Sequence, residues 1–138
     1  MKITQKYLNE LTYNIIGCAI EVHRHLGPGL LESIYTKCFA RELTLKGIEY
    51  KTQLWLPIEY KGVHLVAELR LDVLVENNIL IELKAIDMVL PVHHAQVLTY
   101  MKLMQKPKGI LINFNCMNIF KDGQKTFVNE LYKSLPAE

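Results

Sequence analysis

Two apolar segments joined by three polar residues constrain the fold of this chain more than any other feature. Leu69–Val75 and Ile79–Ala85 flank the sequence Glu76-Asn77-Asn78, which is a turn signal. Side chains alternate across a strand, so pairing Val75 with Ile79 brings the apolar residues of both segments onto one face. We therefore predict a β-hairpin with a three-residue loop. Its buried face comprises Leu71, Val73, Val75, Ile79, Ile81 and Leu83.

The predicted register also decides where the charged residues of the hairpin lie. It places Asp72 directly opposite Glu82 on the second face, and Lys84 follows two residues later on the same strand. A two-residue turn at Asn77-Asn78 would shift the pairing by one and send the two acids to opposite faces. The three-residue loop instead needs Asn78 in the left-handed region, a conformation that asparagine tolerates.

An opposed pair of carboxylates calls for a compensating charge. The two acids repel each other and resist ionising together unless a cation lies between them. Hard oxygen ligands in an open cluster suit Mg²⁺ or Mn²⁺. The alternative is a solvent-facing strand pair in which Asp72, Glu82 and Lys84 make ordinary surface contacts. The hairpin alone leaves these two interpretations equally open.

The pattern Glu-x-Lys is weak evidence by itself, because chance produces it about once in every two chains of this length. A second copy, Glu59-Tyr60-Lys61, runs into the turn residue Gly62 and has no aspartate on a preceding strand. We expect that copy to lie on the surface. Only Glu82-x-Lys84 is preceded by an aspartate, Asp72, in the matching register.

The whole pattern indicates a single α/β domain over residues 1–138, with no repeat and no linker. Gly27-Pro28-Gly29 separates two segments of helical period, and Pro91 suits the first turn of a third helix. We predict a mixed β-sheet flanked by helices. The helices are expected at 7–26, 31–46 and 91–104, the strands at 50–60, 63–67, 69–75, 79–85 and 109–114, and a last hairpin turn at Asp122-Gly123.

Composition fixes the class of protein but not its partner. Half of the residues are apolar and 22% are charged, as in ordinary globular proteins, and a net charge of +2 neither requires nor excludes a polyanion. Cys18, Cys38 and Cys116 show no C-x-x-C spacing, so we expect reduced, buried residues. No signal peptide and no apolar run of bilayer length is apparent, so we expect a cytoplasmic protein without membrane association.

Asp72 on one strand and Glu82-x-Lys84 on the next resemble the PD-(D/E)XK nuclease signature. Leu71 stands where that signature has proline, a position that varies among its members. Glu32 lies in the first turn of the second predicted helix, where the superfamily places an acidic residue.

Two further motifs narrow the resemblance. Gly29–Tyr35 matches the motif of the GxxExxY family, and the sequences from Ile16 to Gly29 and from Leu80 to Phe114 are similar to that family too. Gln96 and Tyr100 form a Q-x-x-x-Y pattern like that of RecB-type and CRISPR-adaptation nucleases, and they share one helix face. The cysteines that hold a cluster in some RecB-type relatives are absent, so no cluster is implied.

The resemblance implies a restriction-endonuclease-like core and a metal-dependent nuclease that hydrolyses phosphodiester bonds, with DNA expected before RNA. Lys84 would orient or deprotonate the attacking water, and Lys102, Lys106 and Lys108 are candidate phosphate contacts. The implied catalytic residues are Glu32, Asp72, Glu82 and Lys84; the implied ligands of Mg²⁺ or Mn²⁺ are Asp72, Glu82, the Leu83 carbonyl and Glu32; and the implied substrate-binding residues are Gln96 and Tyr100.

Two other functions stay open. The small net charge mildly favours a non-catalytic nucleic-acid-binding or partner module on the same fold, whereas the intact Asp72, Glu82 and Lys84 set opposes it. An apolar pocket away from Asp72 would instead support a small-molecule hydrolase or a structural domain. The sequence also leaves open a homodimer, the strandedness of the substrate and the position of cleavage.

Overall fold

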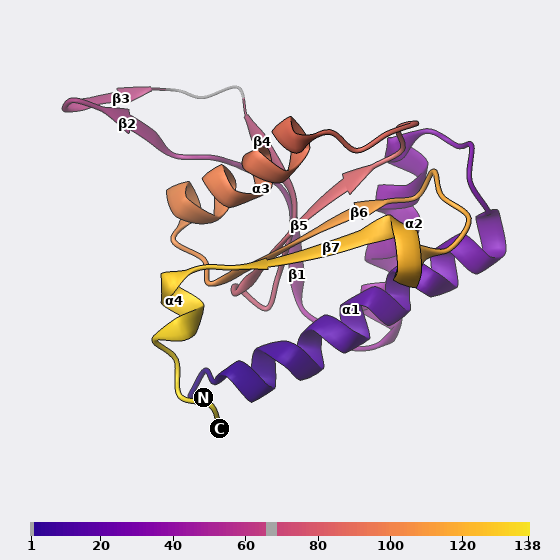
Figure 1. Ribbon diagram of the computed structural model, residues 1–138, viewed down its shortest axis with the longest axis horizontal. Helices are drawn as coiled ribbons and strands as arrows, with labels where there is room; N and C mark the ends of the chain where they lie inside the picture. The colour runs from indigo at the N-terminus through magenta and orange to yellow at the C-terminus, as the bar shows by residue number, and fades with distance from the viewer. Residues whose placement is uncertain (1, 66–68) are drawn as a thin grey trace.

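The computed structural model describes residues 2–65 and 69–138, whose arrangement is shown in Figure 1. The helices are α1 (Gln5–Leu26), α2 (Glu32–Leu45), α3 (Pro91–Met104) and α4 (Glu130–Lys133), with a π-helical turn η1 (Ile119–Gly123). The strands are β1 (Tyr50–Trp55), β2 (Ile58–Tyr60), β3 (Val63–Leu65), β4 (Arg70–Val75), β5 (Ile79–Lys84), β6 (Lys108–Asn113) and β7 (Gln124–Val128).

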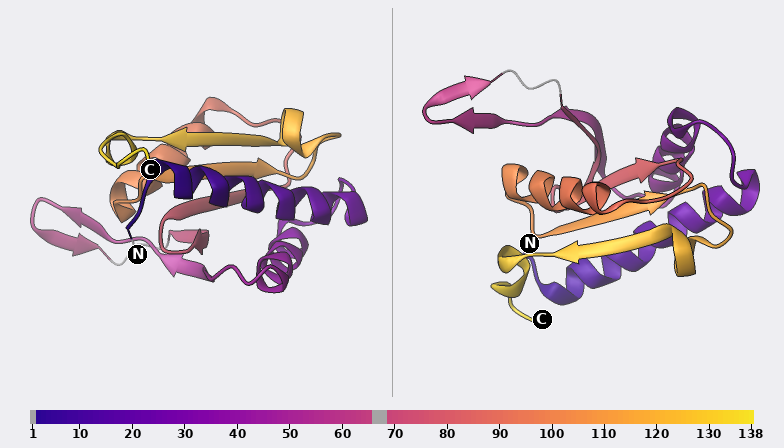
Figure 2. Two further views of the ribbon diagram at one scale, coloured as in Figure 1. Left: turned by 90° about the horizontal axis from the view of Figure 1, so that it is seen from below. Right: turned by 45° about the horizontal axis from the view of Figure 1, so that its top comes forward.

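Among these residues, five strands form a mixed sheet in the order β1-β4-β5-β6-β7. β5 and β6 are parallel and the other neighbours are antiparallel. A parallel pair needs a crossover connection, which α3 provides. The helices α1 and α2 pack on one face of the sheet and α3 packs on the other (Figure 2). The predicted class, a mixed sheet flanked by helices, is confirmed.

Close packing of α3 on the sheet depends on a glycine. A Cβ atom on Gly109 in β6 would come within 2.8 Å of Met101 Sδ and of Val97 Cγ1. Glycine at this position therefore lets the helix approach the strand, which holds the Gln96 and Tyr100 face of α3 near the centre of the sheet.

The predicted register of the β4–β5 hairpin is confirmed, because Val75 pairs with Ile79 and Val73 with Ile81. The predicted left-handed residue is wrong. Glu76 and Asn77 have positive φ values of 50° and 58°, and Asn78 does not. The Asn78 N–H donates to the Val75 carbonyl at 3.0 Å, which makes Glu76 and Asn77 the two central residues of the turn.

The alternation of side chains predicted for β4 is also broken at one point. Leu71 packs in the cluster on the α3 face, whereas Val73 and Val75 pack on the other face. The partner strand β1 is irregular at the same level. Gln53, the residue that falls opposite Asp72 in the register, has a φ of 55°, so both strands bend there and their side chains change sides.

The segment predicted as one strand over 50–60 is two strands, β1 and β2. β2 pairs only with β3 and forms a two-stranded hairpin that projects from the body beyond α3 (Figure 1). Of the strand predicted at 63–67, Val66 and Ala67 lie outside the described residues. The turn predicted at Asp122-Gly123 is the end of η1, after which β7 pairs antiparallel with β6.

Candidate active site

The ladder between β4 and β5 ends at the pair Val73 and Ile81, and Asp72 lies where the two strands diverge. Its carboxylate oxygen Oδ2 accepts a hydrogen bond from the Leu83 N–H at 2.9 Å. Its own N–H donates to Glu82 Oε1 at 3.4 Å. The structure therefore brings the two acids within hydrogen-bond distance, but the predicted common face with Lys84 is wrong, because Asp72 lines a cavity on the α2 side and Lys84 lines one on the α3 side.

These two carboxyl groups share a confined environment. Glu82 is only 3% exposed. Burial and the negative charge of Asp72 raise the pKa of Glu82 to about 8, although the hydrogen bond from the Asp72 N–H and the charge of Lys84 lower it. Burial also raises the pKa of Asp72, although the Leu83 N–H, the hydrogen bond with Glu82 and the charge of Lys84 lower it. At neutral pH the pair is thus held with a proton, which a cation can replace.

Glu32 lies on the α2 side of the divergence. Burial raises its pKa first, the charge of Asp72 raises it further and Lys84 lowers it. The three acids still do not form one ligand group, because the described residues contain no set of three His, Cys, Asp or Glu side chains close enough to hold a metal ion. Glu32 and Asp72 instead share a cavity of about 550 Å³ between α2 and β1. Its lining comprises Glu32, Ser33, Thr36, Lys37, Ala40, Thr52, Gln53 and Asp72.

The tyrosine of the G-x-x-E-x-x-Y pattern fixes the loop that precedes Glu32. The Tyr35 hydroxyl donates to the Gly27 carbonyl at 2.6 Å and accepts from the Leu30 N–H at 3.1 Å. Its ring stacks on Phe114 with centroids 4.4 Å apart. This tyrosine is therefore a packing and positioning residue, and Glu32 is the member of the pattern that lines the cavity with Asp72.

On the other side of the sheet, Lys84, Gln96 and Tyr100 line a second cavity of about 520 Å³. Gln96 Nε2 donates to the Tyr100 hydroxyl at 2.9 Å, while Gln96 Oε1 is buried without a hydrogen-bond partner in the described part of the chain. Burial raises the pKa of Tyr100; the Gln96 hydrogen bond lowers it, and the charges of Glu82 and Asp72 raise it. The α3 pair thus lies within electrostatic reach of both acids.

Two residues of this region were missed by the sequence analysis. Asn113 pairs with Lys84 in the β5–β6 register, and its amide bonds both the N–H and the carbonyl of Ile86 at 3.0 and 2.9 Å. It therefore fixes the chain just after the lysine. A signal was available, since an asparagine interrupts the apolar run Gly109–Phe114. Gln53, whose backbone bends β1 beside Asp72, carries no such signal.

The prediction that Lys106 and Lys108 contact phosphate is contradicted by their positions. Lys108 is 4% exposed and donates to Asn9 Oδ1 at 2.8 Å, at the opposite end of β6 from the site. Lys106 donates to Asn77 Oδ1 at 3.1 Å, beside the β4–β5 turn. Both lysines follow α3 at its far end, because the helix reverses the chain direction between two parallel strands.

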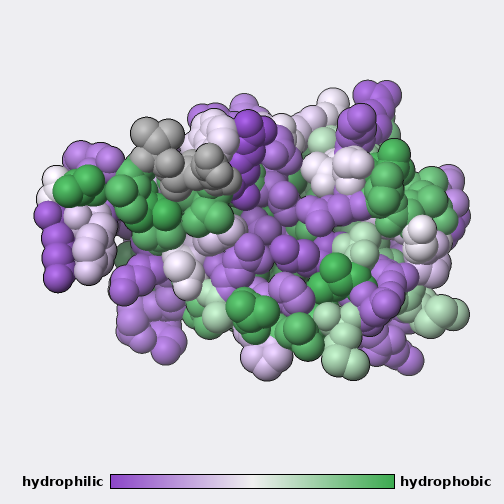
Figure 3. All heavy atoms as spheres, turned by 90° about the horizontal axis from the view of Figure 1, so that it is seen from above, coloured by the Kyte–Doolittle hydropathy of each residue, from purple (hydrophilic) through white to green (hydrophobic). Residues whose placement is uncertain are grey.

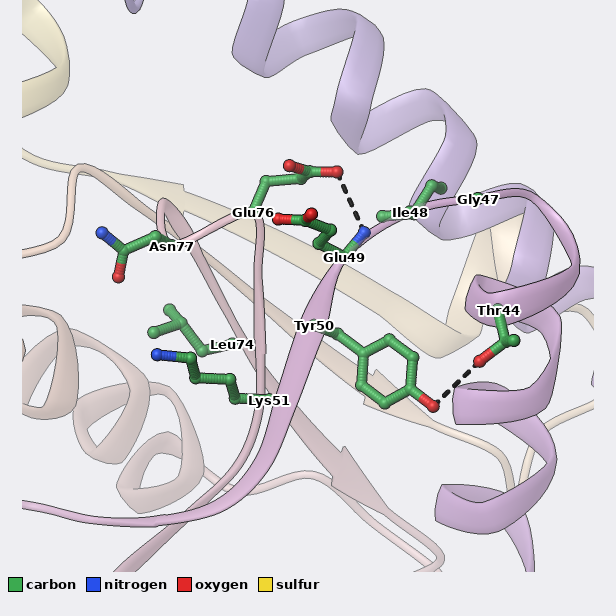
Figure 4. A pocket seen from close by; sticks show the side chains of 9 residues that line it. All are labelled: Thr44, Gly47, Ile48, Glu49, Tyr50, Lys51, Leu74, Glu76 and Asn77. Carbon is green, nitrogen blue, oxygen red and sulfur yellow. Dashed lines mark hydrogen bonds between the residues drawn. The ribbon is translucent and has the colours of Figure 1, made fainter.

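A cavity of about 710 Å³ lies at this far end of the hairpin and contains none of the site residues (Figure 4). Glu76 accepts a hydrogen bond from the Glu49 N–H at 3.0 Å on its wall, and Lys51 and Asn77 also line it. Ile48, Tyr50 and Leu74 line it as well, so the cavity has both apolar and charged walls.

A sequence model of the PD-(D/E)XK nuclease superfamily matches residues 9–127. With the fold and the paired acids described above, the chain belongs to the PD-(D/E)XK nuclease superfamily. The crystal structure of SSO0001 is similar, with 20% identity, a TM-score of 0.43 and coverage of 86% of this chain and 78% of that chain. No curated protein matches the sequence. None of the helices in the described residues is long and apolar enough to span a membrane.

Proposed function

We propose that this protein is a metal-dependent nuclease that hydrolyses phosphodiester bonds, with DNA as the preferred nucleic acid. One observation carries the proposal. Glu82, on the central strand β5, is 3% exposed and lies against Asp72, so the pair is stable only with a bound proton or a bound cation. A protein has little reason to bury one acid against another unless a cation compensates their charges.

The donor atoms at this position fit Mg²⁺ or Mn²⁺. Carboxylate oxygens of Asp72 and Glu82 are hard ligands, and the Leu83 carbonyl is the proposed third protein oxygen. Glu32, which lines the adjoining cavity, would act through a water molecule or hold a second ion. When bound, the metal supplies Lewis-acid stabilisation of the phosphoryl oxygens and a more acidic water.

The remaining residues would act on the water and the substrate. Lys84 would hydrogen-bond the attacking water and balance charge on the phosphoryl group as the water oxygen bonds to phosphorus and one ester bond breaks. The unpartnered oxygen of Gln96 and the Tyr100 hydroxyl would hold Lys84 or the substrate strand in the cavity that all three line. Together with the pattern at Gly29–Tyr35, this arrangement supports assignment to the GxxExxY group with a Q-x-x-x-Y helix.

The direct test is cleavage of labelled single-stranded and duplex DNA and RNA with Mg²⁺, with Mn²⁺ and with EDTA. Asp72→Ala and Lys84→Ala should each lower metal-dependent cleavage at least about a hundred-fold. Lys133→Ala is the matched control, since Lys133 lies in α4, where its ion pair with Glu130 is exposed. Cleavage that survives both site substitutions would remove this assignment.

The alternative is a non-catalytic nucleic-acid-binding module on the same fold. It predicts no cleavage of any of these substrates, together with no uptake of Mn²⁺ by calorimetry. Heat of Mn²⁺ binding that disappears in Asp72→Ala would exclude it in favour of a metal site.

A further inference from the structure

A tryptophan and an arginine lie together at the base of the projecting β2–β3 hairpin. Trp55 is the last residue of β1 and pairs in register with Arg70, the first residue of β4. The Arg70 guanidinium lies over the indole, 4.2 Å from the ring centroid, and Trp55 is still 53% exposed. The cation covers part of the ring and the rest of it is open to solvent.

This pair lies beside the acids of the site. Arg70 precedes Asp72 by two residues, which is about 7 Å along a strand. The neighbouring pair, Leu54 and Leu71, packs on the α3 face, so alternation turns Trp55 and Arg70 to the other face, where α2 lies. The cavity that Asp72 shares with α2 is on that face too. A strand with a phosphate at Asp72 would therefore reach Trp55 within about two stacked bases.

We propose that Trp55, backed by Arg70, is a base-stacking platform for an unpaired strand of nucleic acid. The inference rests on the proposed nuclease function and names its substrate class as single strands or frayed ends. An aromatic ring stacks on any exposed base, and a guanidinium beside it attracts the phosphate backbone. In a duplex, both faces of a base are already stacked on its neighbours, so the platform selects unpaired strands.

The β2–β3 hairpin carries a second exposed aromatic ring with a cation beside it. Tyr60 is 62% exposed, and Lys61 Nζ lies 5.3 Å from its ring centroid, which makes a second aromatic and cation pair. Tyr60 and its partner Val63 face one side of the hairpin, and Glu59 and His64 face the other. Figure 3 shows hydrophobic side chains gathered on the hairpin, at the left of that view. Interfaces between proteins are depleted of lysine, so Lys61 beside the exposed Tyr60 ring favours nucleic acid over a second copy of the chain.

The platform can be observed directly, because Trp55 is the single tryptophan of the chain. Titration with a thymidine oligonucleotide of about twelve residues in EDTA, where no cleavage occurs, should change the intrinsic fluorescence until it saturates. The same oligonucleotide paired with its complement should bind at least about ten-fold more weakly. Unchanged fluorescence on binding, or equal affinity for both forms, would overturn the proposal.

Substitutions distinguish base stacking on Trp55 from non-specific electrostatic binding of the oligonucleotide. With a fluorescein-labelled oligonucleotide, Trp55→Ala should weaken binding about ten-fold or more, whereas Trp55→Phe should stay within about three-fold. Tyr13→Ala removes another exposed ring, which is on α1 and 81% exposed, and should change nothing. Equal losses for the three variants would contradict a stacking role. A wild-type dimer that dissociates in Trp55→Ala, by sedimentation, would assign the surface to a second copy instead.

The outcomes distinguish this inference from the nuclease proposal. Binding in EDTA that depends on Trp55, without cleavage under any metal condition, would support the stacking platform and contradict the nuclease proposal. Cleavage of single strands with an unchanged KM in Trp55→Ala would keep the nuclease and remove the platform. If both hold, Trp55→Ala raises KM and leaves kcat nearly unchanged, since the stack contributes equally before and during the reaction.

Discussion

The chain contains the tripeptide pattern Glu-x-Lys three times, and the copies at Glu59 and Glu82 have opposite environments. Glu82 and Lys84 belong to β5, which has a strand paired on each side, and Glu82 is 3% exposed. Glu59 lies on β2, in a two-stranded sheet outside the body, and faces His64 on the neighbouring strand. Lys61 belongs to the turn that follows, with a φ of 48°.

This difference shows that the chemical properties of the Glu-x-Lys motif depend on the residues that surround it in the fold. The carboxyl group of Glu82 is enclosed between β4, β6 and α3 and lies against Asp72, so its charge has to be compensated. The carboxyl group of Glu59 is exposed to water, which solvates it.

The largest contrast is expected in catalysis. Glu82→Gln keeps the size of the side chain but removes a charged metal ligand, so metal-dependent cleavage should fall at least about a thousand-fold. Glu59→Gln, the same change in the exposed Glu59-x-Lys61 copy, should remain within about two-fold. Initial rates on a single-stranded substrate measure both. Comparable rates for the two variants would mean that burial beside Asp72 does not make Glu82 functional.

The second contrast concerns stability without metal. Because the folded-state pKa of Glu82 is raised to about 8 from 4.5, the folded protein binds more protons than the unfolded chain between these values. The free energy of unfolding should therefore fall as the pH rises from about 4.5 to 8 and level off above it. At pH 8 in EDTA, Glu82→Gln should be more stable than wild type by roughly 2 to 4 kcal/mol.

Urea denaturation at several pH values between 5 and 9 measures this, with Glu59→Gln as the control. The control should follow the wild-type profile at every pH. A Glu82→Gln profile that also follows wild type would show that the buried acid titrates normally.

The third contrast is proton release. Metal binding requires the deprotonated carboxylate, so Mn²⁺ should displace about one proton near pH 7 from the wild-type protein and from Glu59→Gln. Glu82→Gln has no such proton to lose and should release none. Calorimetry in two buffers of different ionisation enthalpy separates these cases, and binding without proton release in wild type would contradict the shared-proton description of the pair.

The sequence predicted the hairpin and its paired acids because one slip of register would move every apolar residue of two strands to the wrong face. Gly27-Pro28-Gly29 and Pro91 likewise predicted where helices end and begin, from backbone chemistry that is local. The left-handed turn residues were predicted one position late, since loop length alone does not determine which residue takes the strained conformation.

The bend beside Asp72 could not be predicted, because its cause is not local. Glutamine has no preference for the left-handed region, and nothing adjacent to Gln53 signals a turn. The bend arises where the Asp72 carboxylate takes the Leu83 N–H, which ends the ladder between β4 and β5. The Asp72 side chain thus replaces a backbone carbonyl as the acceptor of the Leu83 N–H. The alternation of apolar and polar residues along a strand does not predict such a replacement.

The smallest effect tests this bend. Gln53 has a φ of 55°, a conformation that a β-branched residue adopts only with strain, so Gln53→Val should lower the free energy of unfolding by about 1 to 3 kcal/mol. Thr52→Val, one residue earlier on the same exposed strand, should change it by less than about 0.5 kcal/mol. Urea denaturation measures both. Equal effects would show that β1 is regular at Gln53. The packing of Leu71 and Val73 on opposite faces of the sheet would then have another cause.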